Sequence, residues 1–250
     1  MNLDAYFRRI GYDGPSQPTL ETLRLLHRAH LLAVPFENLD IHLKREIVLD
    51  EARLFDKIVN QRRGGFCYEQ NGLFTAVLRQ IGFTVTMLEA RVGAKEWEGG
   101  SPPFDHMTLL VDLEERWLAD VGFGDSFMEP LRFDCDGEQV QLRGTFRVQH
   151  DGFEGVHSRK TQADDWHDEY LFRLEPHTLD DFEPGCYFNQ YSPKSHFTQQ
   201  RVCSLATPTG RITLSDRRFI VTENGKRTEH DLDSEAAFQR YLREYFQIEL

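Results

Sequence analysis

The sequence predicts an α+β multidomain protein, because helix-like and strand-like patterns lie in separate parts of the chain rather than alternating. Residues 1–82 are dominated by apolar residues at helical spacing, whereas residues 83–190 contain mainly short runs typical of strands. Residues 191–250 combine short strand-like runs with a final helix-like run. We therefore expect a helical first domain, a strand-rich second domain and a mixed third domain with these boundaries.

Two helix starts are evident in the first region. Thr19 and Asp50 each precede a helix-like run, and a Thr or Asp side chain at this position accepts a hydrogen bond from a first-turn N–H group. On the first of these helices, His27 and His30 lie one turn apart and could in principle ligate a metal. The sequence offers no carboxylate or cysteine at a supporting spacing, so we expect a packed or surface helix and no metal site.

A third helix is predicted directly after two glycines, and it begins at a cysteine. Gly64 and Gly65 precede Phe66 and Cys67, and Gly82 provides a natural helix end. The apolar residues within this run recur at helical spacing: Leu73, Phe74, Val77, Leu78 and Ile81. Cys67 would thus lie in the first turn, where unpaired N–H groups and the helix dipole favour an anion such as a thiolate.

Two interpretations of Cys67 are open from this segment alone. A thiolate at a helix start would be a nucleophile, and the neighbouring glycines, which lack Cβ atoms, would let a substrate approach. Alternatively, Cys67 would be a small apolar side chain packed in the core, which is the commoner role of an isolated cysteine.

The next region supplies a histidine and an aspartate on a predicted antiparallel hairpin. Residues 104–111 and 116–121 are typical of strands and are joined by a short polar turn. If His106 pairs with Asp120, the turn is centred on Leu113. Directly opposed residues point to the same side of a sheet, so the carboxylate could orient the imidazole toward a thiol. This combination favours an activated nucleophile over a hairpin with one exposed His–Asp pair.

The remaining elements complete the three regions. A further strand of the second region is expected at 142–148. The third region should contain strands around 202–205, 212–214 and 219–222. Asn224 and Gly225 are typical of a tight hairpin turn, and Ser234 precedes a final helix that extends to about residue 246.

Composition indicates a soluble globular protein and limits its partners. The 250 residues are 40% hydrophobic and 28% charged, with a net charge of −12. This charge argues against nucleic acid or an anionic membrane as the main partner, and no apolar run is long enough for a membrane span. The N-terminus does not resemble a signal peptide, and the four cysteines lack CxxC spacing. We therefore expect a cytoplasmic protein with reduced thiols.

Taken together, these segments resemble the arylamine N-acetyltransferases nearly from end to end of the chain. The residues that carry the resemblance are 34–39 (VPFENL), 63–71 (RGGFCYEQN), 104–106 (FDH), 120–124 (DVGFG), 192–198 (SPKSHFT) and 246–250 (FQIEL). Each motif is short, but their combination in this order is highly specific.

The resemblance implies both a fold and a reaction. The three regions would be a helical bundle, a β-barrel and an α/β lid, with a core related to transglutaminases and distantly to papain-like proteases. Cys67 would be the nucleophile, His106 the base and Asp120 the residue that orients it. The implied activity is acetylation of arylamines, arylhydrazines or N-hydroxyarylamines, by a ping-pong mechanism through an acetyl-cysteine. Acetyl-CoA would be the donor, and the role would be in xenobiotic metabolism.

Further site residues follow from the resemblance alone. Those expected beside the acetyl-CoA donor are Gly122, Phe123, Gly124, Phe197 and Thr198. Those expected to form an apolar slot for the aromatic acceptor are Phe36, Val92, Phe123 and Phe197. Asp125 directly follows the Gly122–Gly124 loop, and its carboxylate would be unfavourable beside a pyrophosphate unless it points away.

Two acidic residues in the motifs receive no catalytic role. Glu37 and Glu69 could serve as general acids, but nearby arginines such as Arg62 or Arg63 make structural ion pairs the better interpretation.

Three other functions fit parts of the pattern. An amide synthase that closes a macrolactam would use the same three residues with a carrier-bound acyl chain. A transglutaminase-like cysteine hydrolase would differ in its acceptor. A binding protein without activity would be credible if Cys67, His106 or Asp120 were missing, and all three are present.

Overall fold

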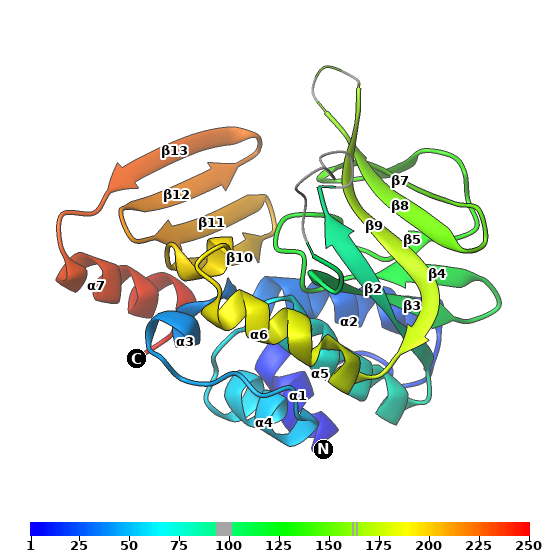
Figure 1. Ribbon diagram of the computed structural model, residues 1–250, viewed down its shortest axis with the longest axis horizontal. Coiled ribbons are helices and arrows are strands. Elements are labelled where there is room, and N and C mark those ends of the chain that lie inside the picture. Colours follow the sequence, from blue (N-terminus) through cyan, green and yellow to red (C-terminus); the bar gives the residue numbers. More distant parts are fainter. Residues whose placement is uncertain (94–101, 162, 164) are drawn as a thin grey trace.

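The computed structural model describes residues 1–93, 102–161, 163 and 165–250. Figure 1 shows the N-terminal helices below two sheets, which lie side by side above them. The eight-stranded sheet contains the second region of the sequence, and the five-stranded sheet belongs mainly to the third. The functional residues predicted from the sequence lie where these parts meet.

The first region is helical, as the sequence predicts. Its helices are α1 (Leu3–Ile10), α2 (Leu20–Ala33), α3 (Leu39–His42), α4 (Glu51–Phe55) and α5 (Cys67–Ile81), with a π-helical turn η1 at Asp56–Asn60. Thr19 and Asp50 cap α2 and α4, because each side chain accepts a hydrogen bond from a first-turn N–H group. Gly82 ends α5 with a left-handed φ of 110°.

Helix α5 is the most deeply buried of these helices, and every residue from Cys67 to Leu78 is buried. Its polar residues are therefore paired within the protein rather than with solvent. The carboxylate of Glu69 accepts a hydrogen bond from the Phe66 N–H at 3.2 Å, which fixes the first turn. The start of α5, and with it Cys67, is thus held rigidly.

The second region forms an antiparallel sheet in the order β5-β4-β3-β2-β9-β8-β7-β6. Its strands are β2 (Thr84–Val92), β3 (His106–Asp112), β4 (Arg116–Ala119), β5 (Leu131–Arg132), β6 (Gln139–Gln141), β7 (Gly144–His150), β8 (Glu154–Lys160) and β9 (Trp166–His177). The sheet curls so that β5 approaches β7, which makes a nearly closed barrel around an apolar core.

Glutamine side chains, rather than a backbone ladder, link the two ends of this sheet. Gln139 on β6 accepts a hydrogen bond from the Arg132 N–H at 2.7 Å and donates one to its carbonyl at 2.9 Å. Gln141 accepts from the N–H groups of Met128 and Glu129 at 3.0 and 3.1 Å, and donates to the Glu129 carbonyl at 2.7 Å. These amides satisfy backbone groups that would otherwise be unpaired at the seam.

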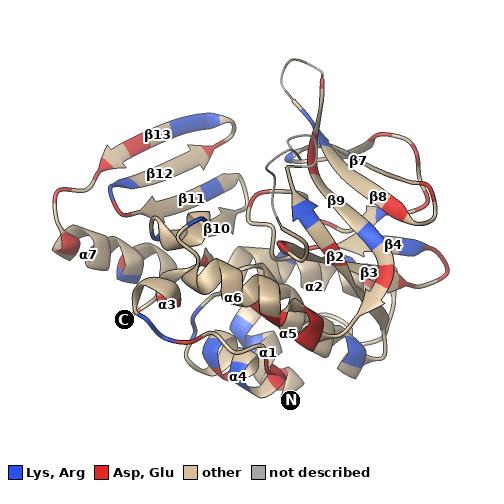
Figure 2. Ribbon diagram, viewed as in Figure 1, with Lys and Arg blue, Asp and Glu red and all other residues tan. Residues whose placement is uncertain are grey.

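The third region forms a sheet in the order β1-β10-β11-β12-β13, covered by α7 (Glu235–Phe246). Its strands are β1 (Phe36–Glu37), β10 (Val202–Thr207), β11 (Gly210–Ser215), β12 (Arg218–Glu223) and β13 (Lys226–Asp231). Asn224 and Gly225 make the predicted turn with φ of 47° and 77°. The edge strand β13 is fully exposed and carries charges of both signs, which discourages edge-to-edge pairing (Figure 2).

Three features of the structure were not predicted from the sequence or differ from the prediction. In the second region, which is mainly strands as expected, a helix that was not predicted, α6 (Glu183–Tyr191), follows a 3₁₀ turn at Leu179–Phe182. The 3₁₀ turn begins with a capping box formed by Thr178 and Asp181. Strand β1, which is only two residues long and lies within the helical region, joins the lid sheet rather than the bundle.

The third of these features is the register of the hairpin, which needs correction. Leu109 pairs with Ala119 and Asp112 with Arg116, so the turn is centred on Glu114 and the pairing is shifted by two residues. A shift of two keeps every side chain on its original face, because side chains alternate with a period of two. His106 and Asp120 therefore still share a face, although they are not directly opposite. The boundaries at 82/83 and 190/191 stay a prediction.

The glutamine seam predicts a stability effect. Gln141→Ala should lower the free energy of unfolding by about 1–3 kcal/mol, because three buried or half-buried backbone groups lose their partner. Urea denaturation measures the change. Gln149→Ala, an exposed glutamine on β7, is the matched control and should be nearly neutral. Equal stabilities of the two variants would contradict a role for Gln141 in closing the barrel.

Candidate functional site

The start of α5 places Cys67 at a cleft. The Cys67 side chain is 97% shielded, since its relative exposure is 3%, yet it lines a cavity of about 580 Å³. The two preceding glycines are required by close packing: a Cβ on Gly64 would lie 1.9 Å from the Pro35 carbonyl oxygen, and one on Gly65 would lie 2.7 Å from the Glu69 side chain. The backbone just before α5 therefore packs so closely against Pro35 and Glu69 that a larger residue would not fit at either glycine.

The electrostatic surroundings of the thiol act in opposite directions. Burial raises the pKa of Cys67 well above its usual value, and the carboxylates of Asp105 and Asp120 raise it further. The backbone N–H of Tyr68 donates a hydrogen bond to the sulfur and lowers the pKa. Since burial is the largest of these effects, the start of α5 does not by itself lower the pKa of Cys67 below its usual value.

His106 and Asp120 form the predicted pair. His106 begins β3 and Asp120 directly follows β4, and His106 Nε2 lies 2.7 Å from Asp120 Oδ2. Both side chains are buried, and His106 lines the same cavity as Cys67. Burial alone would raise the pKa of Asp120, but His106, Asn71 and the Gly122 N–H together lower it. The carboxylate is therefore held in its charged form.

Asn71 is a site residue for which the sequence suggested no role. Its Nδ2 donates to Asp120 Oδ1 at 2.9 Å and to the Met107 carbonyl at 2.7 Å, while its Oδ1 accepts from the Val121 N–H at 2.9 Å. Gly122 N–H also donates to Asp120 Oδ1, at 2.9 Å. Asn71 lies one turn after Cys67 on the same helix, so it connects the helix that carries Cys67 to the carboxylate of Asp120. Its place in the 63–71 motif was the available signal.

The two histidines of α2 are structural. His27 Nε2 accepts from the Asp120 N–H at 3.1 Å and its Nδ1 lies 3.0 Å from the Met128 carbonyl. His30 contacts the Tyr6 hydroxyl at 2.7 Å and Gln70 Oε1 at 3.1 Å. Burial lowers the pKa of His27 to about 4 and that of His30 to about 3, so both stay neutral near pH 7. They match the packed-helix expectation.

A second polar network supports the other side of the cleft. The Tyr68 hydroxyl donates toward the carbonyls of Phe104 and Asp105, at 2.7 and 3.0 Å, just before His106. Asn189 of α6 donates to this hydroxyl at 3.1 Å and accepts from Ser195 Oγ at 2.7 Å. Residues from the bundle, the barrel, α6 and the lid are thus connected through one buried tyrosine.

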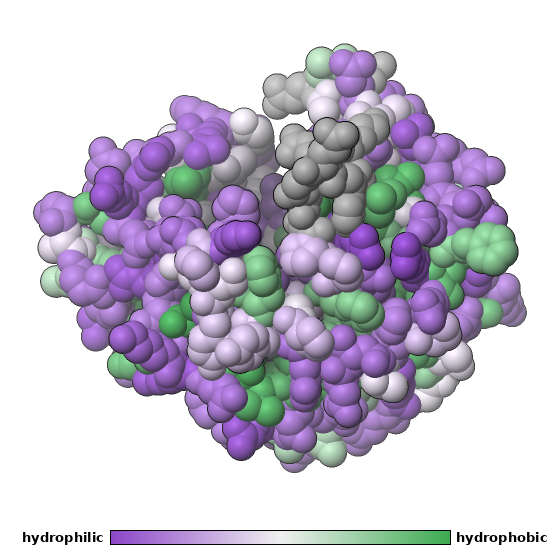
Figure 3. Space-filling view, in the orientation of Figure 1, coloured by the Kyte–Doolittle hydropathy of each residue, from purple (hydrophilic) through white to green (hydrophobic). Residues whose placement is uncertain are grey.

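Most of the residues predicted to contact acetyl-CoA or the aromatic acceptor line the cavity. These are Phe36, Val92, Gly122, Phe123 and Phe197. The Phe36 and Phe197 rings lie 6.0 Å apart, and the Phe123 ring contacts the His106 ring edge-on at 5.3 Å. In Figure 3 the surface is hollowed at the top of the view, beside the lobe formed by the lid sheet.

Two of the residues predicted to lie beside acetyl-CoA, Thr198 and Gly124, form hydrogen bonds to other parts of the protein. Thr198 Oγ1 donates to the carbonyls of Ser192 and Ser195, both at 2.9 Å. The Gly124 carbonyl accepts from Arg211 of the lid. The carboxylate of Asp125 faces Arg211 Nε at 3.3 Å and Arg159 Nη1 at 3.6 Å, so its charge is paired with arginines.

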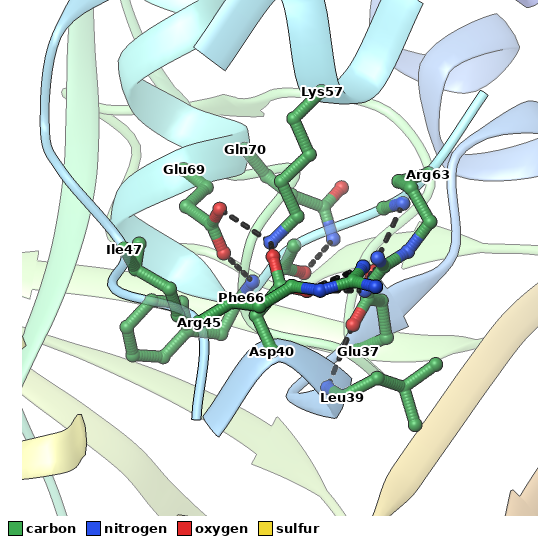
Figure 4. A network of polar contacts seen from close by, with 12 residues as sticks. Glu37, Leu39, Asp40, Arg45, Ile47, Lys57, Arg63, Phe66, Glu69 and Gln70 are labelled. Carbon is green, nitrogen blue, oxygen red and sulfur yellow. Dashed lines mark hydrogen bonds and ion pairs between the residues drawn. The ribbon is translucent and has the colours of Figure 1, made fainter. Parts of the chain in front are cut away.

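Glu37 and Glu69 belong to a buried ionic network next to the start of α5 (Figure 4). Arg63 lies 2.8 Å from Glu37 and 3.0 Å from Asp40, and Lys57 lies 2.8 Å from Asp40 and 2.7 Å from Glu69. Burial would lower the pKa of Lys57, but the surrounding carboxylates raise it, so the ammonium stays charged. The predicted structural role fits, although Glu69 pairs with a lysine rather than an arginine.

Within 1–93, 102–161, 163 and 165–250, no group of three or more His, Cys, Asp and Glu side chains is arranged to hold a metal ion. In the same part of the chain, no helix is both long and apolar enough to cross a membrane.

Comparison with known proteins identifies the family of the chain. A family model described as N-acetyltransferase matches residues 19–250. The chain is 37% identical to the arylamine N-acetyltransferase of Escherichia coli (strain K12), over 98% of this chain and 88% of that protein. It is 39% identical to the arylamine N-acetyltransferase / N-hydroxyarylamine O-acetyltransferase of Salmonella typhimurium, over 91% of this chain and 81% of that protein.

A solved structure extends the agreement to three dimensions. The Mycobacterium marinum arylamine N-acetyltransferase in complex with CoA superposes with a TM-score of 0.91 at 31% identity, covering 99% of this chain and 93% of that one. With a cysteine at a buried helix start, a hydrogen-bonded His–Asp pair beside it, and relatives that match along nearly its full length, the chain belongs to the arylamine N-acetyltransferase family.

Proposed function

We propose that this enzyme transfers an acetyl group from acetyl-CoA to an aromatic amine, hydrazine or hydroxylamine in two steps, through an acetyl-Cys67 intermediate. The observation that carries the proposal is a single cavity lined by Cys67 and His106, with His106 hydrogen-bonded behind the cavity to buried Asp120. This is the arrangement of an activated thiol nucleophile. The same arrangement supports a Cys-His-Asp core of the papain and transglutaminase type.

The first proton transfer follows from the electrostatics of the site. His106 Nε2 is bonded to Asp120, which leaves Nδ1 to accept the proton of the Cys67 thiol. The resulting imidazolium is stabilised by the charged carboxylate behind it. Because burial raises the pKa of the thiol, the thiolate exists here only as a partner of the imidazolium. Asp120 therefore contributes to forming the nucleophile as well as to orienting the ring.

In the first half-reaction, the Cys67 thiolate attacks the thioester carbonyl of acetyl-CoA. The backbone N–H of Tyr68 lowers the pKa of the sulfur, and we expect this group at the start of α5 to stabilise the developing oxyanion. The bond from the acetyl carbon to the CoA sulfur breaks, and the CoA thiolate takes the proton from His106. Acetyl-Cys67 and neutral His106 remain.

In the second half-reaction, the amine nitrogen attacks acetyl-Cys67, and His106 removes its proton. The bond to the Cys67 sulfur breaks, and the thiolate is restored beside the imidazolium. The aromatic part of the acceptor would lie among Phe36, Phe123 and Phe197, which line the cavity. The Salmonella typhimurium relative, whose name includes N-hydroxyarylamine O-acetyltransferase, supports hydroxylamine acceptors.

The nucleophile can be identified by chemical labelling. Iodoacetamide at neutral pH should modify Cys67 well ahead of the other three cysteines, because only Cys67 lies beside His106 in the cleft. Prior incubation with acetyl-CoA should protect it, as followed by peptide mass spectrometry. Cys135, which is half-buried, is the internal control. Equal labelling with and without acetyl-CoA, or normal turnover by Cys67→Ala, would exclude the proposed intermediate.

The orienting carboxylate predicts a tautomer effect. In Asp120→Asn the new amide can keep the bonds to Asn71 and Gly122, but it offers an NH₂ group to His106 Nε2. The imidazole would then carry its proton on Nδ1 and could not accept one from Cys67. Acetyl-Cys67 formation, followed by stopped-flow, should slow by about 10⁴-fold, as for a triad carboxylate.

The control for this variant is Asp134→Asn, which removes a half-exposed carboxylate paired with Arg116. An exposed pair contributes ~1 kcal/mol or less, so this variant should acylate normally. A loss below tenfold in Asp120→Asn would mean that Asp120 is only a structural partner of His106.

The acceptor slot predicts a separation of the two half-reactions. Phe123→Ala should raise the KM for an arylamine severalfold, since an aromatic contact contributes ~0.5–1.5 kcal/mol beyond area burial. The rate of acylation by acetyl-CoA should change little. Phe153→Ala, at an exposed phenylalanine of the barrel, serves as the control. If Phe123→Ala instead abolished acylation while leaving acceptor selectivity intact, the residue would belong to the donor site or the core.

A further inference from the structure

The loop of residues 122–125 determines the shape of the cavity next to the nucleophile. A Cβ on Gly122 would lie 2.8 Å from both the Cα and the carbonyl oxygen of Cys67, so the loop backbone packs directly on the start of α5. The Phe123 ring contacts His106 at 5.3 Å and Tyr170 at 5.2 Å. A small displacement of this loop would therefore move a wall of the cavity relative to the reacting sulfur.

One arginine of the lid holds the far end of this loop. Arg211 lies on β11, and its side chain is only 13% exposed. Its Nη2 donates to the Gly124 carbonyl, its Nε faces Asp125 Oδ1 at 3.3 Å, and its Nη1 donates to Ser204 Oγ at 2.8 Å. A planar guanidinium that contacts three groups in fixed directions restrains all of them at once.

These contacts also reach the opposite wall of the cavity. Ser204 on β10 is paired with Phe36 on β1. The backbone of Gly124 lies against the Phe36 ring, since a Cβ on Gly124 would be 3.8 Å from the Cγ atom of Phe36. Arg211 thus touches the loop that carries Phe123 and the strand that is in register with Phe36. The two aromatic walls of the cavity are connected through one side chain that does not itself line it.

The barrel contributes two more arginines to the same junction. Arg143 donates to the carbonyls of Thr207 and Gly210 in the β10–β11 turn. Arg159 donates to the Arg143 carbonyl at 3.1 Å and lies 3.6 Å from Asp125. Burial lowers the pKa of Arg211, whereas Asp125 raises it. Asp125, whose side chain is 55% exposed, therefore pairs at the rim of the junction with the mostly buried Arg211 and with Arg159.

We propose that Arg211 is a positioning residue that sets the width of the acceptor slot, by coupling the lid sheet to the Gly122–Asp125 loop. It holds the loop that carries Phe123 and the strand that pairs with Phe36 in a fixed arrangement, without touching the acceptor. The inference rests on the proposed acetyl transfer, in which these two residues hold the acceptor. It assigns to Asp125 a function that the sequence left open: its charge secures Arg211 rather than facing a pyrophosphate.

The test compares acceptors of different size in Arg211→Gln. This variant can still form hydrogen bonds, but it loses the positive charge and the planar guanidinium that contacts three groups at once. The KM for an arylamine should rise at least fivefold, whereas the KM for unsubstituted hydrazine, which needs no aromatic slot, should stay within twofold. The rate of acylation by acetyl-CoA should also stay within twofold. Arg218→Gln is the matched control, because Arg218 lies on the neighbouring strand β12 in an exposed pair with Glu229.

A double-mutant cycle separates positioning from general destabilisation. Asp125→Asn should raise the arylamine KM in the same way, and the double variant should be no worse than Arg211→Gln, since both changes release the same contact. A proportional rise of both KM values, independent additive effects, or an unchanged arylamine KM would overturn the proposal. If Arg211→Gln does not fold, the KM values for an arylamine and for hydrazine are compared in Asp125→Asn alone.

A second measurement does not depend on activity. Amide hydrogen exchange in residues 120–127 of the unacylated protein should be faster in Arg211→Gln or Asp125→Asn than in the wild type, while exchange in α5 should be unchanged. Unchanged exchange in the loop would overturn the proposal even if the acceptors behaved as expected. Absence of any arylamine turnover in the wild-type protein would instead contradict the proposed function, and the exchange experiment would still decide the role of Arg211.

Discussion

Burial of a charged carboxylate at Asp120 imposes the constraint on which the rest of this site depends. A charge so far from water must be fully hydrogen-bonded. Two of its partners come from other elements, His106 on β3 and Asn71 on α5, and the third is the nearby Gly122 N–H. Since each of these partners is also fixed by its own element, satisfying one carboxylate aligns the barrel with the helix that carries Cys67. The geometry needed for catalysis is thus also the geometry that keeps the interior electrostatically satisfied.

The same principle extends around Cys67. The backbone in front of α5 is clamped by buried charges, with Glu37 paired to Arg63 and Glu69 to Lys57. Removing one member of such a pair would leave its partner buried and uncompensated, which is strongly destabilising. The cleft is therefore bordered by paired charges on the bundle side, and on the lid side by Asp125 with its partners Arg211 and Arg159. Within this frame, burial raises the pKa of the Cys67 thiol, and His106 lines the same cavity.

Sequence patterns predicted the elements more securely than their pairing. Thr19, Asp50 and Ser234 each cap the helix that was expected after them, and the 67–81 helix has its predicted start and end. These features are local, because a cap depends on residues within one turn. The hairpin register was wrong by two residues, and β1 was missed. Both depend on contacts between segments that a periodic pattern does not specify.

For the candidate site too, local features could be predicted from the sequence, whereas contacts between distant segments could not. The sequence by itself determined which residue types are available, their order and the family they resemble, because motifs such as 63–71 and 120–124 are written in consecutive residues. Only the tertiary structure decided what those residues contact. It showed that Asn71 supports Asp120, that Thr198 bonds to its own turn, and that Asp125 faces Arg211. Hydrogen bonds and ion pairs between residues 49 or 86 positions apart arise from packing, which no local pattern records.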